Sequence, residues 1–155
     1  MIYILGFFFL LFEGVISNFV PYFSYSFTIH FSFFILFYLF FLFFHREYRY
    51  LWFGIIAGVF YDLSYTSWFI YHAIFFTVLG FAYLKLLEHT DYPFLSMLLV
   101  LLGGFSLHYF VYGVLQNYVL SWSTYFLYLL QFVLSNSLFF LLGYLLFRKC
   151  KIHKI

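Results

Sequence analysis

The basic residues of this chain are confined to three places along the sequence, and long apolar segments separate them. The three clusters are Arg46 and Arg49, then Lys85, then Arg148, Lys149, Lys151 and Lys154. The chain is 67% hydrophobic and only 8% charged, which is outside the usual composition of a water-soluble domain. This pattern predicts an all-α polytopic membrane protein.

The lengths of the apolar segments predict helices rather than strands. Strands of a membrane barrel alternate over about 10 residues, whereas a membrane-crossing helix needs about 20 apolar residues. We therefore expect residues 1–155 to form a single membrane domain with six transmembrane helices, at 2–20, 26–44, 50–61, 68–87, 94–118 and 125–147, and a basic tail at 148–155. The third helix is short, and a tilt or an extension through Leu63 would lengthen it.

The charge distribution predicts the orientation of these helices. With six spans, the second and fourth loops and both termini share one side, and that side carries every Lys and Arg. Cytoplasmic loops are enriched in these residues, so we expect both termini to be cytoplasmic. Tyr65, Trp122 and Tyr125 flank loops on the opposite side, where aromatic residues serve as interfacial anchors.

Two carboxylates fall inside the apolar segments. An ionisable side chain within a bilayer costs at least about 2.5 kcal/mol on insertion scales, so each is expected to face protein or water. Glu13 is followed by Gly14, and Asp62 continues a four-residue spacing that begins at Gly54 and Gly58. That spacing places Gly54, Gly58 and Asp62 on one helix face, where glycines permit close helix packing. We expect these five residues to line a partner-binding or internal region; alternatively, Glu13 is a satisfied buried group and Asp62 a solvated helix end.

The remaining polar residues of the predicted helices are expected to form hydrogen bonds between helices. They are His108, Tyr112, Gln116, Gln131 and Asn136. His30 and His72 stand alone near predicted helix ends, and no His or Cys spacing is typical of a metal site. Nucleophile motifs and phosphate-binding loops are also missing from the sequence. We therefore expect no metal, no cofactor and no enzymatic activity, and we expect the basic tail to meet anionic lipid rather than nucleic acid.

The segment from Arg46 through Gly54 and Gly58 to Asp62 resembles the core signature of the MreD family of bacterial rod shape-determining membrane proteins. The Glu13-Gly14 pair is similar to an acidic-Gly pair in the first helix of that family. The resemblance implies a six-helix scaffold of the cytoplasmic membrane that helps control cell shape and lateral peptidoglycan synthesis. Its implied partners are an MreC-like single-span protein and, through it, a SEDS glycosyltransferase and a class B penicillin-binding protein. Self-association into a homo-oligomer is left open.

The chain is also similar in size and helix layout to the substrate-binding membrane subunits of energy-coupling-factor vitamin transporters. Those subunits usually carry an Ala-x-x-x-Ala motif in the first helix to dock the energising subunit. Here the corresponding segment, from Ile4 to Glu13, is bulky at every position except Gly6, which disfavours that docking. A solute channel is a weaker alternative, because polar residues are too few to line a wide pore.

Overall fold

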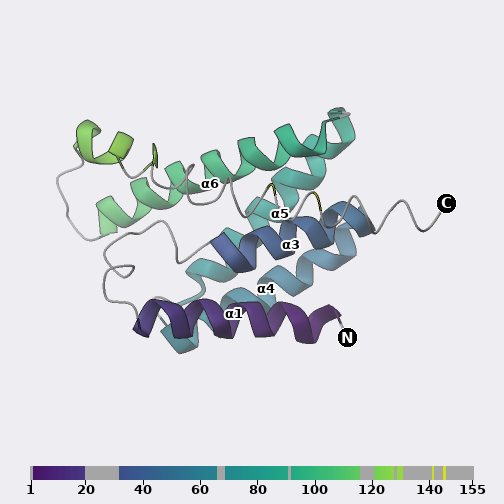
Figure 1. Cartoon of the computed structure of the whole chain (residues 1–155), viewed down its shortest axis with the longest axis horizontal. Helices are drawn as coiled ribbons and strands as arrows, with labels where there is room; N and C mark the ends of the chain where they lie inside the picture. Colours follow the sequence, from purple (N-terminus) through teal and green to yellow (C-terminus); the bar gives the residue numbers. More distant parts are fainter. Residues whose placement is uncertain are drawn as a thin grey trace.

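All regular secondary structure in the described part of the chain is helical (Figure 1). The computed structural model describes residues 2–19, 32–65, 69–90, 92–115, 121–127, 129–130, 141 and 145. The helices are α1 (Ile2–Phe19), α3 (Ser32–His45), the short 3-10 helix η1 (Tyr48–Tyr50), α4 (Leu51–Tyr65), α5 (Tyr71–His89) and α6 (Pro93–Leu115). Residues 122–127, 129, 130, 141 and 145 are helical as well. The all-α prediction is confirmed for these residues.

The third predicted helix was assigned too early an end. It was expected at 50–61, but α4 continues to Tyr65, because no helix-breaking residue follows Asp62. Asp62 therefore lies within the helix rather than at its exposed end. Helix α5 begins at Tyr71, three residues later than predicted.

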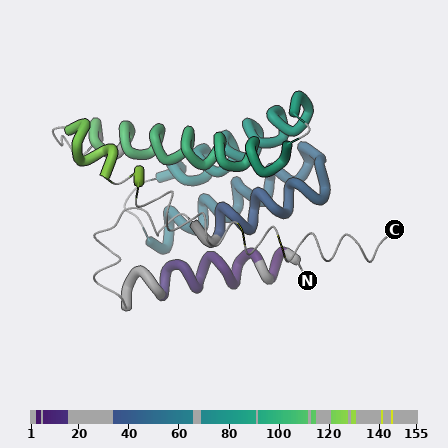
Figure 2. Tube along the Cα trace, turned by 45° about the horizontal axis from the view of Figure 1, so that its top comes forward, coloured from purple at the N-terminus to yellow at the C-terminus, as the bar shows by residue number. Residues whose placement is uncertain are grey.

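The helices form a bundle in which successive helices run in opposite directions (Figure 2). Helix α1 borders α3 and α4, α4 lies along α5, and α5 lies along α6. Helix α3 also contacts α5. As a result, α1 and α6 occupy opposite edges of the bundle (Figure 1).

Helix α3 forms the centre of the bundle. Its residues 34–42 are all buried except Phe37, which is half-buried, as expected for a helix that is apolar on every side. Rings of α3 surround one ring of α4, Phe53, at centroid distances of 5.9, 6.1 and 5.9 Å; they belong to Phe34, Tyr38 and Phe41. Tyr3 and Phe7 of α1 contact the same ring, so this aromatic core joins α1, α3 and α4.

Helices α1, α4 and α5 each carry large apolar side chains on an exposed face, at helical spacing. On α1 these are Ile4, Phe8, Leu11, Phe12 and Val15; on α4 they are Trp52, Ile55, Ile56, Val59 and Leu63; on α5 they are Ile74, Val78 and Phe81. Within the described part of the chain, two segments are long and apolar enough to cross a membrane, Tyr71–His89 and Pro93–Val111. The full set of six spans and the cytoplasmic termini remain predictions.

The described basic residues gather at one end of the bundle. Tyr48 donates a hydrogen bond to Glu88, and Lys85 Nζ lies 2.8 Å from the same carboxylate. The connection after α3, which contains Arg46 and Arg49, therefore lies beside the end of α5. The hydrogen bond from Tyr48 to Glu88 raises the pKa of the Tyr48 phenol, so the phenol keeps its proton and remains the donor.

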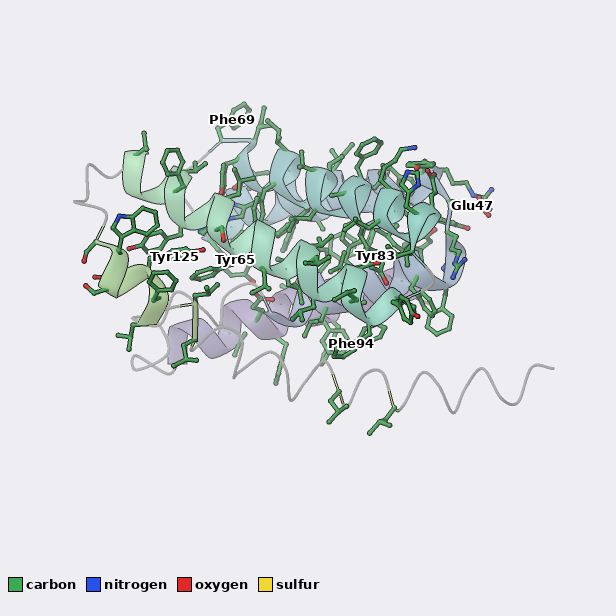
Figure 3. All side chains as sticks on the ribbon, turned by 90° about the horizontal axis from the view of Figure 1, so that it is seen from above. Glu47, Tyr65, Phe69, Tyr83, Phe94 and Tyr125 are labelled. Atoms are coloured by element: carbon green, nitrogen blue, oxygen red, sulfur yellow. The ribbon has the colours of Figure 1, made fainter. Side chains whose placement is uncertain are left out.

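The start of α1 reaches the same end, because the ring of Tyr3 lies 5.2 Å from that of Trp52. Figure 3 shows Glu47 at this end and Tyr65 and Tyr125 toward the other. The four basic residues of the tail lie outside the described residues.

Candidate functional site

Asp62 is buried and bonded to His72 on the adjacent helix. Its side chain receives the backbone N–H of His72 at 2.9 Å on one oxygen and faces the ring Nδ1 of His72 with the other. The residue is only 3% exposed, which rules out the solvated helix end considered above. His72 is therefore not an isolated histidine but the principal partner of Asp62.

Asp62 caps α5 from a neighbouring helix. The first backbone N–H groups of a helix have no partner within it, and a side-chain oxygen normally satisfies one of them. Here the residue before α5 is Ile70, which makes no side-chain capping bond and has a φ of 66°. Such a φ is a strained conformation for a β-branched residue. The Asp62 carboxylate, supplied by α4, takes over the capping role at His72, the second residue of α5.

Glu13 performs the same task for α3. Its carboxylate accepts the backbone N–H of Phe34 at 3.0 Å, and Phe34 is the third residue of α3. Glu13 is also only 3% exposed. Both buried carboxylates therefore cap the first turn of another helix, where the helix dipole favours negative charge.

Two tyrosines connect these capping sites. An added Cβ at Gly14 would overlap the ring of Tyr65, so α1 and α4 approach closely beside Glu13. The ring of Tyr61 lies 5.2 Å from that of Tyr65 and 4.6 Å from that of His72. Tyr61 is within Coulombic range of both carboxyl groups. Glu13 and Asp62, which the sequence singled out, therefore lie in one region of the bundle. The rings of Tyr65 and Tyr61 lie between them.

The two glycines of α4 meet different neighbours. A Cβ at Gly58 would overlap the backbone of His72 and Ala73, so the predicted close helix approach is present there, between α4 and α5. A Cβ at Gly54 would instead come 2.7 Å from the hydroxyl of Tyr38 on α3. Gly58 therefore packs α4 against α5, and Gly54 packs it against a side chain of α3.

His108 joins α6 to the same region. Its Nδ1 lies 2.7 Å from the hydroxyl of Tyr71, and its ring lies 6.0 Å from that of His72. His108 is thus an inter-helix polar residue, as predicted. The side chain of Tyr112 and the residues Gln116, Gln131 and Asn136 fall outside the described part of the chain.

The chemistry available here is that of two carboxylates, two imidazoles and several phenols, held on α1, α4, α5 and α6. Among the described residues, no group of three His, Cys, Asp or Glu side chains is suited to hold a metal ion. Sequence inspection missed His72 because its partner lies ten residues away across a helix connection. The sequence feature that could have pointed to His72 is the glycine at position 58, four residues before Asp62, because Gly58 lets α4 pack closely on the start of α5.

Comparisons of the chain with protein-family models, with characterised proteins and with solved structures find no match.

Proposed function

We propose that this chain is a non-enzymatic membrane scaffold of the MreD type, acting in the cytoplasmic membrane of a bacterium. The observation that carries the proposal is the orientation of its side chains: α1, α4 and α5 turn large apolar residues outward, while Glu13 and Asp62 face inward. A protein of this design acts through its helix surfaces and short connections. Its proposed partners are an MreC-like single-span protein and the SEDS glycosyltransferase and class B penicillin-binding protein of cell elongation.

The outer face of α1 supports a scaffold over a vitamin-transporter subunit. Its small residues, Gly6 and Gly14, are buried against α3 and α4, and Phe8 and Phe12 stack on the exposed side with ring centroids 6.5 Å apart. Docking through small residues on that side is therefore disfavoured. Bulky aromatic faces suit contacts with lipid or with a partner's membrane helix.

The bonding of Asp62 supports a structural role for this carboxylate. One oxygen accepts the backbone N–H of His72 and the other faces its imidazole. A carboxylate engaged in this way contributes to helix capping. Turnover of any substrate by the purified chain that is abolished by Asp62→Asn would overturn the scaffold assignment.

Co-purification with site-specific crosslinking tests the proposal. A photo-crosslinking residue is placed at Phe8 on α1 or at Val78 on α5, both exposed, and at Phe53 in the core as a matched control. We expect one or both outer positions to capture a single-span protein with a large extracytoplasmic domain, and the control to capture none. Capture of an ATPase module and its membrane coupling subunit would instead establish the transporter alternative.

A further inference from the structure

The connection between α3 and α4 combines charged side chains with exposed aromatic rings. It follows a helix that is apolar on every side, and it begins with Arg46. Tyr48 lies in the connection and Trp52 in the first turn of α4, and both are exposed. Tyr and Trp are enriched where a membrane meets water. Glu47 marks this end of the bundle in Figure 3.

Arg46 differs from the other two described basic residues because no described carboxylate neutralises its charge. Arg49 forms a salt bridge with Glu47, and Lys85 Nζ lies 2.8 Å from a carboxylate oxygen of Glu88. Both described carboxylates of this end are therefore already engaged. Among the described residues, no salt bridge and no side-chain hydrogen bond includes the exposed Arg46 guanidinium. Its N–H donors are available to an anion from outside the chain.

The backbone and a neighbouring ring hold Arg46 at the end of α3. Its N–H donates a hydrogen bond to the carbonyl of Leu42 at 2.7 Å, and its φ is 48°. Glycine adopts this left-handed conformation without steric cost, whereas a residue with a Cβ does not. The guanidinium carbon lies 5.5 Å from the centroid of the Phe43 ring, which is within the range of a cation–π contact.

We propose that Arg46 and the connection that it begins bind the phosphate group of an anionic phospholipid in the cytoplasmic leaflet. A guanidinium presents planar N–H donors that match two phosphate oxygens. Under the predicted orientation, the cytoplasmic side carries all seven Lys and Arg residues but only three acidic ones, Glu47, Glu88 and Asp91. Anionic headgroups of that leaflet attract basic residues beside a membrane helix. A negatively charged headgroup is therefore favoured over a zwitterionic one.

The surroundings of Arg46 favour a lipid over free phosphate. Exposed apolar side chains continue from the connection along the two adjoining helices, with Phe44 on α3 and Trp52 and Ile55 on α4. These side chains can contact the acyl chains of a lipid whose headgroup lies at Arg46, and inorganic phosphate gains nothing from them. The lipid site requires a cytoplasmic basic end but no protein partner, so it does not depend on the scaffold role.

Competition for fluorescent phosphatidylglycerol bound to the full chain in nonionic detergent tests the site. Unlabelled phosphatidylglycerol and phosphatidylcholine with the same acyl chains are the competitors. We expect phosphatidylglycerol to compete better, and Arg46→Gly to weaken its binding about fivefold, the usual contribution of one basic residue beside anionic lipid. Phosphatidylcholine binding should not change. Because glycine fits the φ of 48°, the thermal unfolding midpoint of this variant should equal or exceed that of the wild type.

Two further variants distinguish a site from general electrostatic attraction. Lys154→Gln removes the same charge from the tail and should leave phosphatidylglycerol binding nearly unchanged. Glu47→Gln releases Arg49 from its salt bridge and should tighten that binding. Equal weakening by Arg46→Gly and Lys154→Gln, or equal competition by the two lipids, would overturn the proposal.

Inorganic phosphate distinguishes a lipid site from a free-anion site. Added in large excess, it should not displace the fluorescent lipid, and full displacement would refute the lipid as occupant. Arg46→Asn replaces Arg46→Gly if the glycine variant does not fold, because asparagine also adopts the left-handed conformation. All measurements use the purified chain and lipid alone, so the absence of an MreC-like partner and the absence of a lipid site are separate results.

Discussion

Gly58 is the residue at which the backbones of α4 and α5 come into contact. A Cβ there would overlap the backbone of His72 and Ala73, whereas a Cβ at Gly103 on α6 would meet no heavy atom within 4 Å. The two glycines therefore form a matched pair, one against a neighbouring backbone and one on an open helix surface.

We expect Gly58→Leu to lower the free energy of unfolding by about 1 to 3 kcal/mol, the usual cost of overpacking a core. Gly103→Leu should have little effect or stabilise slightly, because leucine has the better helix propensity. Thermal unfolding of both variants in the same detergent measures the difference. Equal midpoints for the two variants would place Gly58 on an open surface, contrary to the structure.

Tyr38 on α3 buries a hydroxyl group in the core. It is fully buried, and no described residue offers its hydroxyl a hydrogen bond. The oxygen lies where a Cβ at Gly54 or Gly80 would come within 2.7 or 2.5 Å of it. Leaving a buried hydroxyl unbonded costs about 1 to 3 kcal/mol.

Tyr38→Phe is therefore expected to leave the unfolding midpoint unchanged or to raise it. Tyr38→Leu serves as the comparison, because it removes the ring that packs on Phe34 and Phe53 and should destabilise the core. A clear loss of stability in Tyr38→Phe would mean that the hydroxyl is bonded after all.

At the scale of the helices, the recurring device is a carboxylate that caps a helix other than its own. Glu13 on α1 caps α3, and Asp62 on α4 caps α5. Both capped ends lie at the end of the bundle opposite the basic residues. The first turn of α3 is therefore capped only when α1 places Glu13 beside it. The first turn of α5 depends in the same way on the position of Asp62 in α4.

We expect amide hydrogen exchange to show that the two caps act independently, each one protecting the start of its own helix. Glu13→Leu is expected to speed exchange at Phe34 and to cost about 0.5 to 2 kcal/mol, as for a lost helix cap. Asp62→Leu should speed exchange at His72 and cost about 3 to 5 kcal/mol, because it also removes the partner of a buried imidazole. Glu13→Gln, which keeps an acceptor oxygen, is the milder control. Faster exchange at both helix starts in either variant would contradict two independent caps.

At the scale of the whole molecule, the grouping of Arg46, Arg49 and Lys85 at one end supports the predicted orientation. Such residues are enriched on the cytoplasmic side of membrane proteins. The start of α1 lies at the same end, because Tyr3 packs on Trp52.

Reporter fusions test this orientation and the number of spans together. A reporter inserted between Arg46 and Tyr48 and one fused after Ile155 should both give a cytoplasmic signal, and one inserted after Phe69 an extracytoplasmic signal. An extracytoplasmic signal from the C-terminal fusion alone would mean an odd number of spans between Tyr48 and the C-terminus.

The sequence by itself determined the class of the described structure and the location of its unusual residues. Apolar runs of this length leave only helices, and buried carboxylates stand out against such a background. The four-residue spacing of Gly54, Gly58 and Asp62 placed them on one face, because that spacing follows from helix geometry alone.

Only the tertiary structure decided what those residues contact. The partner of Glu13 is a backbone N–H of α3, and every residue except proline has one, so no sequence pattern marks Phe34. The partner of Asp62 is His72, which depends on where α4 ends, where α5 begins and how closely Gly58 lets them approach. The pairing of Tyr71 with His108 likewise depends on the register of α5 against α6. These contacts are set by the relative placement of helices, which the spacing of residues within one helix does not contain.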